Sequence, residues 1–568
     1  TTVSTGISVS EDGRVFTLSP TDDLSENTSY SVEFSELSDA QFNVATIPAH
    51  TFSTDRLNEW TGLGATDNWS DAGNWSGGYA AGKSVIIPSN SLGNYPVISS
   101  DVEVNNLTID AGAVLTHNGG VLTVLGEFIL KSSVDVNASY INSGAEGVDI
   151  VVDGDKVRVE QVINDVYMTY LISSPTKGTT KANFGGYFPL YLYDNTTDTW
   201  PAVTSSHQMQ AGVGYRMWTD NDIVFFSGEF NTGRVQVPLT YTNGKGYGWN
   251  LVGNPYSASI DWTQLNVIEN SQNIEDNFWV WMPTQRAYGA YSASTTIPLN
   301  IESSIIPSNH AFLVKVVSPE EPAFINFDPA AQVANSRNYL KSAKASATSY
   351  VKFAGVSGKV RDEMAVAFID DASMGLDKYD MEKRFANQNH VLELFTNVGD
   401  MQAAINAVPL DGNYEVALGY NAMVAGDFSI EMVKDNTENV SCILVDKSLE
   451  IEQVLRPGDR YEFSAAKGKN ITRFALKFSK IVTSDRDIER PVADFSCHVL
   501  DSEIFVDFDN AHDGVRFQVA DVQGRILKQG SILDSSKFSV GAYEQGVYVL
   551  TFIDLNGQWY GSQKVVVY

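Results

Sequence analysis

The stretch VEVNNLTIDAGAVLTHNGGVLTVLGEF, residues 102–128, sets short apolar segments between small turn residues at close and even intervals. Short strands that recur at such intervals are typical of repeats that stack into a continuous sheet. We therefore predict that residues 57–165 form a flattened β-helix or stacked-rung sheet.

The flanking sequence also favours strands over helices. VRVEQVI (157–163) and RFALKFSKI (473–481) alternate apolar with polar residues, which is the period of a β-strand. Asp-Gly and Asn-Gly dipeptides, which tolerate the positive φ angles of two-residue hairpin turns, recur along the whole chain. The best helix candidate is DKYDMEKRFANQ (377–388), which also suits a loop with one helical turn. The prediction is an all-β protein built from tandem modules.

Length and charge limit what the chain can be. At 568 residues it is too long for one hydrophobic core, so we expect several domains. Its 38 basic and 69 acidic residues give a net charge of −31, which disfavours binding to nucleic acid or to anionic membranes. No apolar run is long enough to span a membrane. The chain starts inside a strand pattern and not with a basic, apolar leader, so we expect a fragment of a longer protein.

The N-terminal residues 1–56 match the later strands of a sandwich. LSENTSYSV (24–32) is followed by FST (52–54) at the end of the segment. This pattern resembles the bacterial immunoglobulin-like modules that read L-x-x-N-T-x-Y-x-V and close with F-S-T. The resemblance implies a partial immunoglobulin-like domain.

Three tryptophans stand at the start of the stacked-rung segment, in EWTGLGATDNWSDAGNWSGG (59–78). If they are exposed, Trp60, Trp69 and Trp75 could bind carbohydrate, because indole rings stack on sugar faces. The alternative is that they pack a loop onto the first rung. Each tryptophan lies between turn residues beside a predicted sheet end, and this favours the packing interpretation.

Two further stretches share one order of elements. YMTYLISSPTKGTT (167–180) and YGWNLVGNPYSASIDW (247–262) each run an apolar strand into a proline, Pro175 or Pro255. An aromatic strand, a polar turn and another strand follow each proline. Since proline cannot donate to a sheet ladder, each one ends its strand at a fixed point. We interpret these prolines as architectural and predict a duplicated β domain over residues 166–335.

Composition marks the remaining boundaries. Residues 328–350 lose most aromatic residues and gain Ala, Ser and Lys, which indicates a linker. Residues 351–482 are rich in strand patterns and are predicted to form a jelly-roll-like β-sandwich. A second linker, SDRDIERPVADFS (484–496), leads into a small C-terminal β-sandwich at residues 493–568.

The C-terminal module carries three ordered blocks, the first in FQVADVQGRILKQG (517–530) and the other two in FSVGAYEQGVYVLTFIDLNGQWYGSQKVVVY (538–568). Their order and spacing resemble the type A C-terminal sorting domain of the Bacteroidetes type IX secretion system. The matching residues, which the resemblance implies form the sorting signal, are Asp521, Gly524, Arg525, Gly546, Tyr548, Val549, Lys564, Val565, Val566 and Val567.

This resemblance implies partners and a location. The outer-membrane type IX translocon and its shuttle and sortase components would bind the module, and a surface protease would remove it. The protein would then be secreted or held at the cell surface, after passage through the periplasm and the outer membrane.

Other stretches support the same origin. NWSDAGNWSGG (68–78) and GWNLVGNPYSASIDW (248–262) resemble recurrent parts of large secreted Bacteroidetes surface proteins. Together with the sorting blocks they imply a modular, adhesin-like surface protein. The alternative is the carbohydrate-binding C-terminal region of a secreted polysaccharide-acting enzyme, with surface glycans as partners.

We predict no catalytic residue. The seven histidines are scattered without metal-binding spacing, and the sequence has no phosphate loop, dinucleotide fingerprint or G-x-S-x-G motif. Calcium is the favoured inorganic partner, because aspartates alternate with small polar residues at 194–200 and 370–380. A solvated acidic loop is the alternative for both segments. The calcium ligands that we predict are Asp370, Asp371, Asp377 and Asp380.

Overall fold

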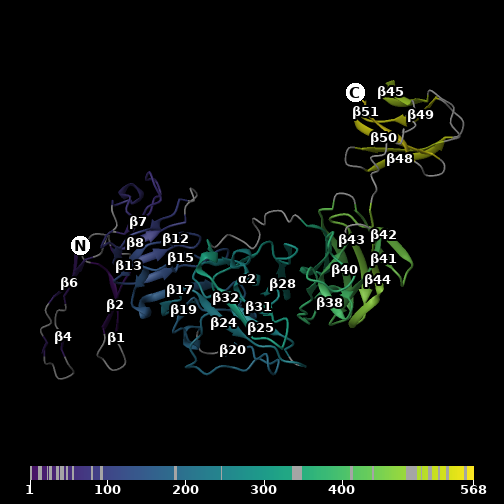
Figure 1. Ribbon diagram of the computed structural model, residues 1–568. Helices are drawn as coiled ribbons and strands as arrows, with labels where there is room; N and C mark the ends of the chain where they lie inside the picture. The colour runs from purple at the N-terminus through teal and green to yellow at the C-terminus, as the bar shows by residue number, and fades with distance from the viewer. Residues whose placement is uncertain are drawn as a thin grey trace. The chain divides into compact units, whose positions relative to one another are not determined.

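The protein folds into two compact units, Thr1–Lys480 and Ile481–Tyr568, in a computed structural model (Figure 1). The structure describes residues 3–9, 16–21, 24, 29–33, 37–38, 44–45, 49–53, 57–78, 81–89, 94–184, 189–244, 246–334, 348–409, 413–437, 440–480, 495–500, 502–508, 515–521, 525–532, 537–554 and 559–567. Strands dominate both units, so the prediction of an all-β protein is confirmed. Within these ranges α-helix is limited to α1 (Trp262–Leu265) and α2 (Val267–Asn270). No helix in the described part of the chain has the length and apolar composition needed to cross a membrane.

The first strands form antiparallel pairs. These pairs are β1 (Thr5–Val9) with β2 (Phe16–Pro20), β3 (Ser29–Val32) with β6 (His50–Ser53), and β4 (Leu37–Ser38) with β5 (Val44–Ala45). The β3–β6 pair brings the tyrosine block and the F-S-T block of the immunoglobulin-like pattern side by side, with Tyr30 opposite Phe52.

Residues 58–162 coil into a parallel β-helix with three sheets (Figure 1). The first sheet stacks β7 (Asn58–Glu59), β8 (Val85–Ile87), β11 (Leu107–Ile109), β14 (Phe128–Leu130) and β17 (Val157–Val162). The second stacks β9 (Val97–Ile98), β12 (Val114–His117) and β15 (Ser139–Asn142). The third stacks β10 (Val102–Val104), β13 (Gly120–Val124) and β16 (Val148–Val151). Short 3₁₀ turns at Ala72–Asn74 and Gly154–Lys156 join some of these strands.

Equivalent residues of successive rungs stack in buried columns. Val85, Leu107, Phe128 and Val157 stand in register, spaced 22, 21 and 29 residues apart. Each is at most 1% exposed. Because burial of apolar surface contributes about 25 cal/mol per Å², such columns hold the rungs together without disulfides. The turn residues that recur in the sequence follow this rung period.

From residue 157 onward, one pattern of strand pairing occurs twice. The first copy spans residues 157–230. In it β17 pairs with β22 (Ile223–Phe226), and β21 (Tyr215–Met217) lies between β18 (Tyr170–Ile172) and β20 (Tyr191–Leu192). In addition, β19 (Thr176–Lys177) pairs with β23 (Glu229–Phe230). The second copy spans residues 235–333. In it β24 (Val235–Leu239) pairs with β32 (Ala323–Phe327), and β31 (Ala311–Lys315) lies between β25 (Trp249–Gly253) and β27 (Asn277–Met282). In addition, β26 (Ser259–Asp261) pairs with β33 (Gln332–Val333). β28 (Ala287–Ser292), β29 (Ile297–Leu299) and β30 (Ile305–Ile306) extend the second copy. A 3₁₀ turn, Lys181–Phe184, lies in the first copy, and another, Pro329–Ala331, lies in the second.

Reciprocal contacts join the two copies. The Ser173 N–H donates to Asn309 O at 3.0 Å, and the Gly253 N–H donates to Gly212 O at 2.9 Å. Ser173 and Gly253 hold the same position in the two copies, as do Gly212 and Asn309. A Cβ added at Gly253 would lie 2.1 Å from the Ser173 Cβ. The two equivalent positions therefore meet, and there is room for only one side chain.

The prolines that end the repeated strands lie in buried turns. Ser174 Oγ accepts from the Thr176 N–H, and Asn254 Oδ1 accepts from the Tyr256 N–H, so a polar side chain caps the turn in each copy. Pro175 is buried between the first of these pairs. This geometry supports the architectural interpretation of the repeated punctuation.

Residues 349–480 form one curled sheet of eleven strands. Its order is β42 (Ile451–Val454), β41 (Val440–Asp446), β44 (Gly468–Lys480), β39 (Tyr414–Ala422), β37 (Leu392–Val398), β38 (Met401–Val408), β35 (Val360–Phe368), β34 (Ser349–Ser357), β40 (Gly426–Asp435) and β43 (Arg460–Ala465), with β36 (Met381–Glu382) beside β38. Its concave face encloses a core that includes Phe353, Leu394 and Phe474. Residues 335–347, most of the predicted linker, lie outside the described residues.

The opposite face of the curled sheet is also buried. Ala365, Met381 and Ile405 on this face belong to one apolar cluster with Trp279 and Leu313 of the second copy. The β-helix and the first copy likewise share a single core. Burial therefore continues across the predicted boundaries from residue 58 to residue 480.

The helix prediction for residues 377–388 is wrong. The segment contains a turn and the short strand β36, which pairs with β38. Met381 and Lys383 are both buried, and the Lys383 ammonium contacts the buried Asp362 carboxylate at 2.5 Å. Alternate burial and this ion pair fix an extended backbone, which overrides the helix propensity of the sequence.

The C-terminal unit is a small sandwich. One sheet has the order β45 (Phe495–Leu500), β46 (Glu503–Phe508) and β49 (Lys537–Ala542). The other has the order β48 (Ile526–Ile532), β47 (Val515–Asp521), β50 (Gly546–Asp554) and β51 (Trp559–Val567). Val506 of the first sheet and Leu550 of the second share one buried cluster. The unit thus has a core of its own.

Candidate functional site

The three tryptophans proposed as a sugar platform are buried. Trp60, Trp69 and Trp75 are 0%, 1% and 4% exposed. Trp75 meets Trp60 and Trp69 edge to face at 5.1 and 4.7 Å between ring centroids. The Trp60 N–H donates to Asn94 O, and the Trp75 N–H donates to Trp69 O. A buried indole offers no face to a sugar, so the stacking hypothesis is wrong for these residues and the packing interpretation holds.

The four aspartates proposed as calcium ligands do not converge. Asp370 and Asp371 are exposed, whereas Asp380 is buried. Asp377 accepts the Ser373 N–H, and Asp380 accepts the N–H groups of Asp377 and Ala407. Burial raises the pKa of Asp380 to about 6. In the described part of the chain, no group of three or more His, Cys, Asp or Glu residues is placed to hold a metal ion. Asp377 and Asp380 therefore stabilise the loop, and Asp380 also ties it to β38 through Ala407.

The first sorting block closes a hairpin between β47 and β48. Asp521 accepts the Arg525 backbone N–H at 3.0 Å, and the Arg525 guanidinium contacts the same carboxylate at 3.0 Å. The Asp521 N–H in turn donates to Arg525 O. Gly524, which the resemblance also implicates, lies outside the described residues. The Asp–Arg pair therefore fixes the turn, while the Arg525 side chain stays 73% exposed.

The other two blocks lie side by side on β50 and β51. Tyr548 is buried, and its hydroxyl donates to Glu544 O at 2.8 Å beside Gly546. Val549 faces Lys564 across the two strands. β51 is the edge strand of its sheet, and its residues alternate: Val565 and Val567 are buried, whereas Lys564 and Val566 are exposed. The structure thus brings the described matching residues onto one sheet, except Arg525, which lies directly before β48.

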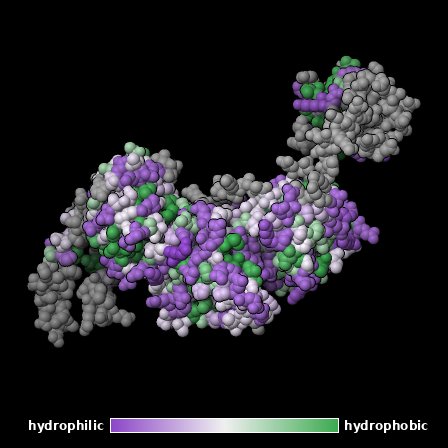
Figure 2. Space-filling view, viewed as in Figure 1, coloured by the Kyte–Doolittle hydropathy of each residue, from purple (hydrophilic) through white to green (hydrophobic). Residues whose placement is uncertain are grey.

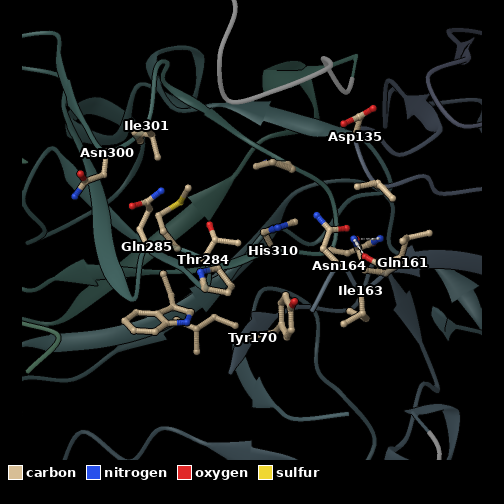
Figure 3. A pocket seen from close by; sticks show the side chains of 18 of the residues that line it. Asp135, Gln161, Ile163, Asn164, Tyr170, Thr284, Gln285, Asn300, Ile301 and His310 are labelled. Atoms are coloured by element: carbon tan, nitrogen blue, oxygen red, sulfur yellow. Dashed lines mark hydrogen bonds between the residues drawn. The ribbon is translucent and has the colours of Figure 1, made fainter. Parts of the chain in front are cut away.

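A cleft of about 600 Å³ lies elsewhere, within the first compact unit. Residues of the β-helix, both copies and the curled sheet line it, among them Asn137, Gln161, Tyr170, Trp281, Gln285 and Arg361. Figure 3 shows two facing groups with aromatic rings between them, and the labelled residues on the two sides are Gln161, Ile163 and Asn164, and Gln285, Asn300 and Ile301. The volume of the cleft falls within the range of small-ligand sites, which measure roughly 300–1,000 Å³.

The two basic groups of the cleft pair with one carboxylate, and the other acidic lining residues, Asp135 and Glu302, are exposed. The Lys352 ammonium lies 3.0 Å from the Glu363 carboxylate, and the Arg361 guanidinium lies 3.6 Å from it. Glu363 also accepts the Asn300 N–H at 2.7 Å. His310 donates from Nδ1 to Ser308 O, and burial lowers the pKa of His310, so that its ring is neutral at neutral pH. The polar lining that remains is dominated by amide side chains.

Sequence reasoning missed this cleft. Its residues come from eight separated stretches, and no local motif links Asn137, Tyr170, Trp281, Asn300 and Arg361. Two aromatic residues near the repeated strand, Trp218 and Tyr167, remain 42% and 66% exposed, but their exposure cannot be read from the sequence. On the face shown in Figure 2, hydrophilic residues cover much of the coloured surface.

A protein-family model matches residues 59–478 of the chain. The chain belongs to this family, DUF8693, a domain of unknown function. The DUF8693 match begins at β7, where the β-helix starts, and ends within β44, the long strand that completes the curled sheet. The DUF8693 region thus comprises the β-helix, both copies and the curled sheet, and it contains the cleft. No curated protein matches the chain.

Solved structures show only faint likenesses. A β-glucuronidase from Ruminococcus gnavus in complex with N1-substituted uronic isofagomine is 8% identical, with a TM-score of 0.12 and coverage of 26% of this chain and 37% of that one. The apo form of that enzyme is 10% identical, with a TM-score of 0.11 and coverage of 26% and 36%. The matched part is about a third of the enzyme, and similarity at this level does not bear on the activity of the DUF8693 chain.

Proposed function

We propose that the C-terminal unit is an export signal that the type IX secretion machinery recognises. The DUF8693 region is then the passenger that this signal brings to the cell surface. The observation that carries this proposal is edge strand β51. It presents exposed Lys564 and Val566 on a strand that, among the described residues, pairs with a neighbour on one side only in its sheet. An open edge can accept a partner strand, which is a common mode of peptide recognition.

The separate core of the unit supports the same role. A tag that is recognised and then removed must fold without its passenger. The described residues of 495–567 bury their own cluster, and the chain divides at residue 480. The three blocks resemble type A sorting domains, and this resemblance is the reason for proposing the type IX secretion machinery as the partner that recognises the tag.

The first experiment deletes residues 493–568 from the full chain in a Bacteroidetes host with an active type IX system. We expect the truncated protein to accumulate in the periplasm, whereas the full chain reaches the surface or the medium. Cell fractionation and surface protease accessibility measure the difference. Normal surface display of the truncated chain would contradict the proposal.

A point variant separates recognition from folding. Lys564→Glu reverses the charge of an exposed edge residue and leaves the buried Val565 and Val567 in place, so we expect a folded unit with impaired export. Lys528→Glu, an equally exposed change on β48 at the other edge of the same sheet, is the matched control. Equal export of both variants would show that β51 is not the strand that is read.

A further inference from the structure

Two tryptophans meet at one residue beside the cleft. The Trp218 N–H donates to Thr169 Oγ1 at 2.6 Å, and the Trp281 N–H donates to Thr169 O at 2.9 Å. Trp281 lines the cleft, as does Tyr170, the neighbour of Thr169. Both indoles are therefore held in place. The Tyr167 N–H donates to Thr219 O, next to Trp218, and we call Tyr167, Trp218 and Trp281 the aromatic shelf.

The second copy shows that the fold does not require this shelf. Trp218 occupies the position that Lys315 holds in the second copy, and Thr169 occupies the position of Trp249. There, Trp249 is 4% exposed, and Lys315 forms ion pairs with Glu275 and Glu382. In the first copy the equivalent position holds an indole that is 42% exposed. The second copy forms the same strand pairs without a tryptophan at this position, so strand pairing does not explain the exposed indole of Trp218. We take this exposed indole as a sign of ligand binding.

The walls of the cleft present polar groups that both donate and accept. Asn164 is exposed at the cleft, and Gln161 and Gln285 lie on facing walls (Figure 3). Asn300 and Asn309, which also line the cleft, each hold a buried amide oxygen with no hydrogen-bond partner among the described residues. Hydroxyl groups match amides because they also donate and accept. Lys352 and Arg361 already pair with Glu363, and the other charged lining residues, Asp135 and Glu302, are acidic, so the lining disfavours an anionic ligand.

We propose that the cleft and its aromatic shelf bind a neutral oligosaccharide. Sugar rings stack on Trp218 and Tyr167, because the apolar face of a sugar fits the face of an aromatic ring. Hydroxyl groups further along the glycan enter the cleft and pair with Asn164 and the other amides. This site is independent of the export proposal, since it lies in the DUF8693 region.

The test applies the full chain to an array of neutral gluco-, xylo- and manno-oligosaccharides, with arms of uronic acid glycans, sulfated glycans and unrelated peptides. Titration calorimetry then measures the affinity for the best neutral glycan. We expect Trp218→Ala and Asn164→Ala to weaken binding at least about tenfold, the equivalent of about 1.4 kcal/mol. Both side chains are exposed, so the variants should unfold at the temperature of the parent.

Tyr247→Ala is the matched control. Tyr247 holds the position of Tyr167 in the second copy, is 56% exposed and has the same left-handed backbone, with φ of 47° against 64°. We expect Tyr167→Ala to weaken binding and Tyr247→Ala to leave it unchanged. The proposal is overturned if the folded chain binds none of the neutral glycans, if it binds only charged glycans or peptides, or if the Trp218 and Asn164 variants bind as well as the parent.

Discussion

The first copy of the repeat shares its core with the β-helix, whereas the second packs the outer face of its sheet against the curled sheet. The strand pairing is the same in both, but the side chains on this face differ. Arg216 of the first copy lies over the Tyr191 ring at 4.5 Å, and its counterpart Leu313 is 1% exposed in an apolar cluster. Backbone pairing sets the scaffold, and the outward-facing residues adapt each copy to its neighbour.

The largest effect is expected where the copies meet. Gly253→Val places a side chain in the space that Ser173 occupies, so we expect a loss of more than about 4 kcal/mol in the free energy of unfolding, or no folded protein. Denaturant titration measures the loss. The exchange Ser173→Gly with Gly253→Ser moves the side chain to the other copy and should recover most of the stability. If the exchange is as damaging as Gly253→Val, the two positions are not equivalent.

An intermediate effect on the free energy of unfolding is expected when the outer faces of the two copies are compared. Trp279 and Tyr191 hold the same position, but Trp279 is 1% exposed and packs on Trp249, whereas Tyr191 is only half-buried. We expect Trp279→Ala to cost about 3–5 kcal/mol. Tyr191→Ala should cost about 1–2 kcal/mol, because less apolar area is lost. Similar losses in the two variants would contradict the assignment of different neighbours to the two copies.

The smallest effect concerns pH. Burial raises the pKa of Asp276, just before β27 in the second copy, from 3.8 to about 6. A carboxyl group with a raised pKa contributes stability below its unfolded value, and that contribution is lost as the pH rises through about 6. Asp276→Asn should therefore raise the melting temperature above about pH 7 and have little effect near pH 4. Asp220→Asn, the same charge change at an exposed residue of the first copy, is the control and should show no such trend.

The strand content and the stacked rungs could be predicted from the sequence because both depend on local residue patterns. Turn spacing predicted the stacked rungs, and alternation predicted an all-β chain, since both depend on residues close in sequence. The burial of Trp60 was uncertain because turn residues flank exposed and buried tryptophans alike. The helix prediction failed at Lys383, whose partner Asp362 lies in another strand. The cleft could not be predicted, because its residues converge only after all the modules have packed.

The last rung of the β-helix has a further consequence. A parallel stack that ends on an unpaired strand can template a second chain and grow into filaments. Here β22 runs antiparallel along β17 and closes the first sheet. The second copy covers β15, where Ser257 Oγ donates to Tyr140 O and Gln332 donates to Asn142 O. The two copies thus cap this end of the β-helix and disfavour its pairing with a second chain.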